Sequence, residues 1–256
     1  VSTRRMSSPR SPRQKRRRFQ PMNSRIMVSE TSHSAPVTGR ESRKARLERM
    51  HAEYAILCST YPEPECALHF ETPLQLLIAT VLSAQTTDKR VNTVTPELFA
   101  TYPSCSDLAC ANPEDVERII RPLGFYRTKT KHLLGLAQVL ASRFDGEVPS
   151  TMDELTSLPG VGRKTANVVL GNAFHIPGFP VDTHVMRVTG RLRWRSDWRH
   201  ANPNPVAIER EITACFPPEQ WTDLSHRLIL HGRAICHARK PDCGICPLAD
   251  SCPSAR

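Results

Sequence analysis

A lysine next to a glycine-rich turn is the side chain of this sequence best placed for covalent chemistry. Lys164 follows Leu158-Pro-Gly-Val-Gly-Arg163, a pattern that predicts a short helix ending at Leu158, a tight turn and a second helix opening at Arg163. The dipole of that second helix disfavours a positive charge in its first turn, which favours the neutral amine. A neutral lysine is a nucleophile that can form a Schiff base with a carbonyl carbon.

The turn itself predicts a site for an anion. Gly160 and Gly162 permit backbone shapes that other residues resist, and with Val161 between them they let main-chain N–H groups approach a ligand. These N–H groups and the positive end of the second helix suit a phosphate, and they would hold a nucleic acid without reading its bases. The alternative is an ordinary corner between two helices, with glycine as the cap.

A carboxylate follows eighteen residues after the lysine. Asp182, in Val181-Asp-Thr-His184, stands where a new helix begins, and an N-cap is the simplest role for an aspartate there. The same carboxylate could stabilise positive charge developing at a sugar carbon, or shuttle protons. Because Lys164 and the phosphate-binding turn occur in the same sequence, we favour the catalytic interpretation.

Four cysteines near the end of the chain have the spacing of metal ligands. Cys236, Cys243, Cys246 and Cys252 follow the pattern C-x6-C-x2-C-x5-C. Four thiolates suit either a structural zinc ion or an iron–sulfur cluster, and the spacing alone does not choose between them. Buried thiols are the explanation we expect for most of the other five cysteines, which are Cys58, Cys66, Cys105, Cys110 and Cys215.

The positive charge of the chain lies almost entirely in its first residues. The 256 residues carry a formal net charge of +10, but residues 1–46 hold 13 basic residues against two acids, and residues 47–256 have a net charge of −1. Residues 1–42 are rich in Ser, Pro and Arg and poor in apolar residues, so we expect a disordered basic tail. It could bind a polyanion or serve as a nuclear or organellar address. Alternatively, the product begins at Met22 or Met27.

Several classes of protein are excluded by composition. The longest apolar run, around residues 74–84, is about half the roughly 20 residues of a membrane-spanning helix. Nine cysteines, four of them crowded at one end, do not suit a disulfide-stapled secreted protein, and no apolar secretory signal is evident. We therefore expect a protein of an intracellular, reducing compartment.

The body of the chain reads as helices throughout. Apolar residues recur at helical spacing, helix-starting Pro and acids are placed at first turns, and no hairpin dipeptide separates alternating strands. The class is therefore predicted to be all-α. The predicted helices outside the glycine turn are 43–58, 73–83, one from Pro113 to near Gly124, 129–144, 206–216 and 219–236.

The glycine turn and the aspartate together carry a resemblance to a known family. Leu158–Leu170 with Val181–His184 resembles the helix–hairpin–helix and following aspartate of the endonuclease III family of DNA glycosylases, and the likeness extends over about residues 43–252. It implies that Lys164 attacks C1′ of a damaged nucleotide while Asp182 assists, and that β-elimination then cuts the strand on the 3′ side of the abasic sugar. It also implies a 4Fe–4S cluster on the four terminal cysteines. Related adenine-specific mismatch glycosylases lack the lysine.

The same resemblance implies further contacts with DNA. An enzyme that acts at C1′ must rotate the nucleotide out of the stack and fill the gap that it leaves. Gln85, in the run Ser83–Asp88, matches a glutamine that inserts into this gap, with a hydrogen bond at the helix end as the alternative role. A second wedge position, commonly leucine in the family, is Phe125 here, with core packing as the alternative. Arg239 and Lys240 lie between the first two cysteines in a loop that looks like a phosphate-contacting one.

We therefore expect an all-α, two-domain helix–hairpin–helix glycosylase fold. The expected parts are the tail 1–42, a multi-helix barrel over 66–176, and an iron–sulfur cluster domain formed by 43–65 with 177–256. The expected activity is removal of oxidised pyrimidines from double-stranded DNA and cleavage at the abasic site, by a monomer without membrane contact. The location would be cytoplasm or nucleoid in a bacterium, or nucleus or organelle in a eukaryote. The alternatives are a non-catalytic DNA-structure binder and a monofunctional mismatch glycosylase.

Overall fold

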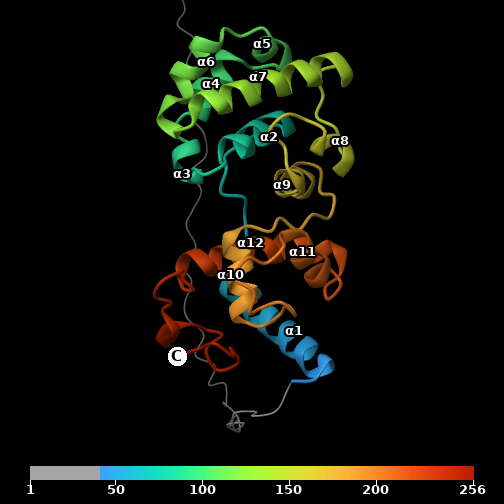
Figure 1. Ribbon diagram of the computed structural model, residues 1–256, viewed down its shortest axis with the longest axis vertical. Helices are drawn as coiled ribbons and strands as arrows, with labels where there is room; N and C mark the ends of the chain where they lie inside the picture. The colour runs from blue at the N-terminus through green and yellow to red at the C-terminus, as the bar shows by residue number, and fades with distance from the viewer. Residues whose placement is uncertain (1–40) are drawn as a thin grey trace, which may run out of the picture. The chain divides into compact units, whose positions relative to one another are not determined.

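Helices account for the regular structure of the unit formed by residues 41–256. We describe residues 41–256 of a computed structural model (Figure 1); the tail expected over residues 1–42, with its alternatives, therefore lies almost wholly outside the described residues. Within residues 41–256 the regular structure is entirely helical, which confirms the predicted all-α class. None of these helices is both long and apolar enough to cross a membrane.

The helices begin at residues whose side chains suit helix starts. Ser42, Thr72 and Asn204 each accept a hydrogen bond from a main-chain N–H of the first turn that follows. The elements, with η for 3-10 turns, are α1 (Arg43–Thr60), α2 (Pro73–Leu82), α3 (Asp88–Val91), α4 (Thr95–Thr101), α5 (Cys105–Ala109), α6 (Pro113–Ile120), η1 (Arg121–Leu123), α7 (Tyr126–Arg143), α8 (Met152–Thr156), α9 (Arg163–Ala173), α10 (Thr183–Arg191), α11 (Pro205–Thr213), η2 (Pro218–Gln220), α12 (Trp221–Ala234) and η3 (Cys243–Ile245).

The predicted helices are present, with shifted ends. Helix α7 begins at Tyr126, three residues before the predicted start, and α12 begins at Trp221 because Pro218–Gln220 form a 3-10 turn. The sequence pattern did not predict α3, α4 and α5. These helices have only four to seven residues, too few for a helical period to show.

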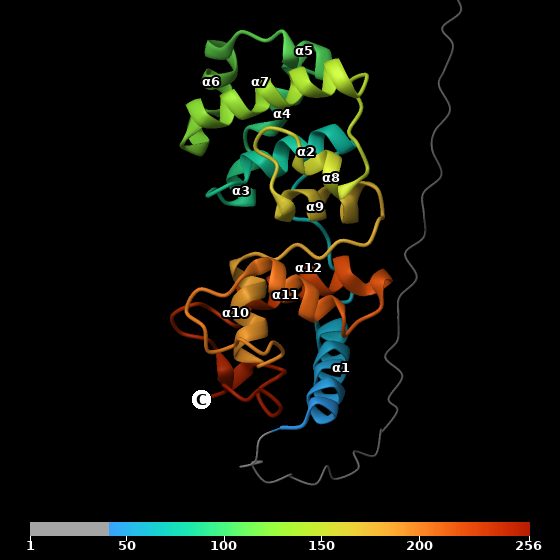
Figure 2. The same ribbon diagram turned by 45° about the vertical axis from the view of Figure 1, so that its right-hand side comes forward.

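Two separate apolar cores lie inside this unit. Buried side chains between Leu68 and Leu170 form the first core, which α2, α7 and α9 share. Side chains of α1, α10, α11 and α12 form the second, centred on Trp194 and Leu228. Figures 1 and 2 show the chain passing between the two groups of helices twice, from α1 to α2 and from α9 to α10. Each crossing is a short segment without helix.

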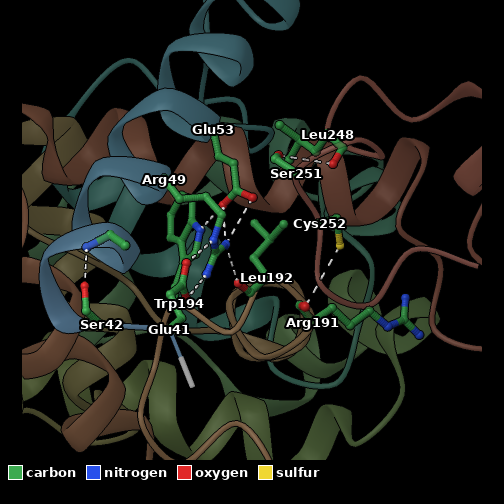
Figure 3. Close-up of polar contacts among 11 residues, drawn as sticks. Glu41, Ser42, Arg49, Glu53, Arg191, Leu192, Trp194, Leu248, Ser251 and Cys252 are labelled. Carbon is green, nitrogen blue, oxygen red and sulfur yellow. Dashed lines mark hydrogen bonds and ion pairs between the residues drawn. The ribbon is translucent and has the colours of Figure 1, made fainter. Parts of the chain in front are cut away.

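A buried carboxylate fixes α1 to the second core. Glu53 is fully buried and accepts a hydrogen bond of 2.5 Å from Trp194 Nε1 and two of 3.1 Å from Arg49 Nη1 (Figure 3). Both partners can only donate, so the Glu53 carboxyl group acts only as an acceptor toward them. Burial raises the pKa of Glu53, and the hydrogen bonds from Trp194 and Arg49 oppose this. Arg49 also donates to the carbonyl of Leu192 at 2.8 Å, which joins α1 to the end of α10.

We expect Glu53→Ala to destabilise the protein by about 2–3 kcal/mol, because it leaves the buried indole N–H of Trp194 without an acceptor and removes one of the two carboxylates that pair with Arg49. Glu53→Gln keeps an acceptor for Trp194 and should lose less. Glu48→Ala, on the same helix with a side chain 67% exposed, is the control and should change stability by less than about 0.5 kcal/mol. Chemical denaturation of the three variants measures this, and equal losses for Glu53→Ala and Glu48→Ala would contradict the role given to Glu53.

Candidate active site between the two cores

The glycine turn connects α8 to α9 as expected, but its two glycines differ. Gly160 has φ +77°, and a Cβ there would lie 2.9 Å from His132 of α7, so both its backbone and its surroundings require glycine. Gly162 has φ −97° and ψ 174°, which any residue adopts, and a Cβ there would meet nothing. The expectation that both glycines serve backbone shape is therefore wrong for Gly162. What Gly162 provides is open space beside the start of α9.

The main-chain donors at the start of α9 lack a side-chain cap. Thr151 and Asp182 cap α8 and α10 with their side chains, whereas Gly162, the N-cap of α9, has no side chain to do so. The N–H of Val161 is not among the free donors, because it donates to Leu158 O at 3.1 Å and the valine side chain is buried. The donors available to an anion thus begin at Gly162, one residue later than the sequence suggested.

Lys164 lies in the first turn of α9, and its side chain is exposed. Its neighbour Arg163 makes a two-pronged ion pair with Glu209 of α11, with both N–O distances 2.8 Å. Because α9 belongs to the first core and α11 to the second, this pair holds the lysine's turn against the boundary between them. Sequence reasoning missed this pair, since its members are 46 residues apart.

Asp182 is the N-cap of α10, and the cap uses only one of its two carboxylate oxygens. One carboxylate oxygen, Oδ1, accepts from the main-chain N–H groups of His184 and Val185 at 2.7 and 2.9 Å. Among residues 41–256 no hydrogen bond reaches the other oxygen, Oδ2. The capping and catalytic interpretations of Asp182 are therefore compatible, because each can use a different oxygen.

Lys164 and Asp182 share a charged neighbourhood at the boundary. The charges of Asp88, Lys164 and Arg233 all act on the pKa of the Cys66 thiol, which burial raises above its usual value. The charges of Asp182 and Arg233 act on His184, whose pKa burial lowers. Arg233 of α12 in turn pairs with Asp88 of α3 at 2.6 Å. The charge of Arg233 thus acts on Cys66 together with that of Lys164, and on His184 together with that of Asp182.

The two candidate wedge residues are both exposed and both in the left-handed backbone region. Gln85 follows α2 with φ 53°, and Phe125 precedes α7 with φ 48°. Such conformations cost a side-chain-bearing residue of the order of 1 kcal/mol each and recur at functional sites. Phe125 is 69% exposed, so the core-packing alternative is wrong. Within the described chain Gln85 makes no side-chain hydrogen bond, so it does not serve as a helix-end hydrogen-bonder.

The four terminal cysteines face one cavity. A small cavity of about 30 Å³ is lined by Cys236, Cys243, Cys246 and Cys252 together with apolar side chains such as Val188 and Leu248. A single zinc ion requires all four thiolates about 2.3 Å from one point. In residues 41–256 no three potential ligands converge that closely. Four cysteines around one space suit the four-thiolate ligation of an iron–sulfur cluster.

The loop that carries Arg239 and Lys240 is held by an arginine that the sequence did not single out. Both loop residues are exposed. Arg191, in the last turn of α10, donates to the carbonyls of His237 and Ala238 at 2.7 Å each and to Cys236 Sγ at 3.2 Å. The only hint in the sequence was a run of five arginines over 187–199, to which we assign no site. Trp194 in that run is a buried anchor of the second core.

The remaining cysteines correct an expectation. Of the five outside the cluster motif, only Cys105 is buried, Cys110 is exposed, and Cys58, Cys66 and Cys215 are half-buried. Cys110 ends the short helix α5, which the apolar pattern did not reveal. Burial therefore does not explain most of these thiols.

Comparison with known proteins agrees with this geometry. The family model of the HhH-GPD superfamily of base excision DNA repair proteins matches residues 78–218, and that of the iron–sulfur binding domain of endonuclease III matches residues 236–252. Endonuclease III of Synechocystis sp. (strain PCC 6803) is 48% identical over 202 residues, or 78% of this chain and 90% of that protein.

Solved structures resemble the chain to a similar extent. A non-covalent endonuclease III–DNA complex is 39% identical with a TM-score of 0.75, covering 80% of this chain and 95% of that one. A trapped endonuclease III–DNA covalent intermediate has the same identity and TM-score and covers 80% and 96%.

The two glycines of the turn should respond differently to alanine. Gly160→Ala should lower stability by about 2 kcal/mol, because of its positive φ and the contact with His132. Gly162→Ala should change stability by less than about 0.5 kcal/mol but weaken binding to duplex DNA about tenfold, the equivalent of one charge-assisted hydrogen bond. Thermal unfolding and fluorescence anisotropy measure the two effects. A stable Gly162→Ala protein with unchanged DNA affinity would contradict the phosphate site.

Proposed function

Because the chain belongs to the endonuclease III family of base excision DNA repair proteins, we propose roles for the residues gathered between its two cores. The protein is a DNA N-glycosylase and a DNA-(apurinic or apyrimidinic site) lyase. It binds DNA, and its cofactor is a 4Fe–4S cluster. The non-catalytic binder and the monofunctional mismatch glycosylase considered from the sequence are therefore set aside.

Lys164 is the proposed nucleophile. Its neutral Nζ attacks C1′ of the damaged nucleotide, and the C1′–base bond breaks with its electron pair leaving on the base. The amine loses a proton as the sugar ring opens to the Schiff base. Loss of a C2′ proton then expels the 3′ phosphate, which cuts the strand on the 3′ side of the sugar. The exposed position of Lys164 at the start of α9, held by the Arg163–Glu209 pair, supports this assignment.

Asp182 is the proposed partner of the lysine. Its Oδ1 is committed to the cap of α10, while Oδ2 remains to stabilise positive charge at the sugar carbon and to move protons. The cap holds the carboxylate in position before the substrate binds, so no binding free energy is needed to order it. The single observation that supports the catalytic pair most is that, within residues 41–256, the cap of α10 uses only Oδ1 of Asp182.

The DNA is proposed to lie along the face that presents the turn, the wedges and the cluster loop. Main-chain N–H groups from Gly162 onward would bind a phosphate, while Gly160 and Val161 give the turn its shape. Gln85 and Phe125 would enter the gap left by the rotated nucleotide, and Phe125 offers an aromatic face for stacking. In the cluster loop Arg239 and Lys240 would contact phosphates.

Cys236, Cys243, Cys246 and Cys252 are the proposed cluster ligands. The cluster is proposed to join the end of α12 to the C-terminal segment and so hold the loop between the first two cysteines in place, together with Arg191. The proposed division into domains, 66–176 against 43–65 with 177–256, is supported by the two separate apolar cores.

The preferred lesions are proposed to be oxidised or ring-saturated pyrimidines in double-stranded DNA, and the enzyme is proposed to act as a monomer. Cytoplasm or nucleoid is the proposed location, because the similar proteins are bacterial endonucleases III. The alternatives for a eukaryotic source, nucleus or organelle, have no support of this kind.

Borohydride trapping on DNA with a damaged pyrimidine tests the catalytic pair. The unchanged protein should form a covalent adduct, and Lys164→Ala should form none. Asp182→Asn keeps a good N-cap and should stay folded while the trapping rate falls about 10²-fold or more. Lys44→Ala, which removes a lysine whose side chain is 87% exposed at the start of α1, is the control and should trap normally. A Lys164→Ala protein that still traps would refute the nucleophile.

A further inference from the structure

A buried lysine joins the two loops that carry the proposed wedge residues. Lys129 of α7 is 4% exposed, and its Nζ donates to Thr86 Oγ1 at 2.6 Å and to the carbonyl of Leu123 at 3.4 Å. Thr86 directly follows Gln85, and Leu123 lies two residues before Phe125. One ammonium group thus reaches both loops.

Two further bonds complete the connection. The Thr86 hydroxyl donates to the same carbonyl of Leu123 at 2.9 Å, so the loops also bond to each other directly. The main-chain N–H of Lys129 donates to the carbonyl of Phe125 at 3.0 Å, which ties the lysine to the second wedge residue through the backbone as well. In both views α3, which follows the first loop, lies next to the start of α7 (Figures 1 and 2).

Core packing does not require a charge at this position. Helix α7 already packs through apolar residues such as Leu133, Leu136 and Leu140, which are fully buried. Lys129 forms no ion pair with a carboxylate among residues 41–256, and burial lowers its pKa. An uncompensated buried ammonium is costly, and an apolar side chain of the same length would fill the space. What the ammonium adds is a hydrogen-bonded link between the two loops.

We propose that Lys129, together with Thr86, is a positioning residue that fixes the spacing of Gln85 and Phe125, so that the two residues enter the duplex as one rigid double wedge. The inference rests on the wedge roles proposed above. Each wedge residue is held in a left-handed conformation that an unrestrained loop would leave, and the Lys129 link supplies the restraint. Loss of the Lys129 link would slow the reaction most where a paired base must be displaced from the duplex. It would slow the reaction least at an abasic site, where no base pair has to be broken.

The experiment therefore compares a paired lesion with an open site. Lys129→Met removes the ammonium at similar length, and Thr86→Val removes the hydroxyl at similar shape. Lys131→Met, an exposed lysine two residues along the same helix, is the matched control. Each protein is given a duplex with one dihydrothymine opposite 2-aminopurine, and separately a duplex with a preformed abasic site.

Lys129→Met and Thr86→Val should lower both the 2-aminopurine fluorescence change and the single-turnover excision rate about tenfold, since displacing a paired base costs a few kcal/mol. Borohydride trapping at the preformed abasic site should change by less than about threefold, because no pair has to be broken there. Lys131→Met should match the unchanged protein. If excision and abasic-site trapping fall by equal factors, or neither falls, the proposal is wrong.

Gln85→Ala and Phe125→Ala distinguish a failure of the positioning role of Lys129 from a failure of the wedge roles on which it rests. If neither of them reduces the fluorescence change, the wedge assignment itself fails. If both reduce it and Lys129→Met and Thr86→Val do not, only the positioning role fails. Should Lys129→Met unfold below the assay temperature, Thr86→Val decides, because it breaks the same link without altering a buried charge.

Discussion

The chemistry of this protein depends on holding two apolar cores at a fixed separation when only two crossings of the chain connect them. Side chains on helices of opposite cores make that connection. Arg163 pairs with Glu209, Asp88 pairs with Arg233, and Asn172 accepts from His226 Nε2 at 2.7 Å if that nitrogen carries the proton. The Arg163–Glu209 pair is the most consequential, because Arg163 is the residue before Lys164. The turn that carries Lys164 is thus held at the boundary between the cores.

The binding of DNA by the body of the chain does not follow from the net charge of that body. The body has a formal net charge close to zero, and the basic residues that give the chain its +10 lie in its first 46 residues. What the body offers instead is local geometry. The start of α9 has unpaired main-chain donors beside open space at Gly162, and Arg191 holds the exposed cluster loop by its carbonyls. A cluster suits this arrangement, because its four thiolate ligands gather the C-terminal segment around one cavity.

Local patterns predicted the helices, the glycine turn and the cysteine motif, because each of these depends on residues close together in the sequence. The sequence did not predict which distant residues lie together in the folded chain. The Glu53–Trp194 hydrogen bond joins residues that are 141 positions apart in the sequence, and the Lys129–Thr86 hydrogen bond joins residues that are 43 positions apart. In neither pair does the sequence around one residue indicate its partner. Nor does the pattern G-x-G reveal that Gly160 is needed for its φ and Gly162 for the space beside it. Sequence thus predicted the local elements better than the side chains that join distant parts of the chain.

The central claim is that the boundary between the cores, through Arg163 and Glu209, sets the position of Lys164. A double-mutant cycle with Arg163→Gln and Glu209→Gln, read as the rate of borohydride trapping at a preformed abasic site, tests it most directly. Each single variant should slow trapping about tenfold, and the double variant should be no slower than either, as for two residues that act as one unit. Rates equal to that of the unchanged protein, or effects that simply multiply, would contradict it.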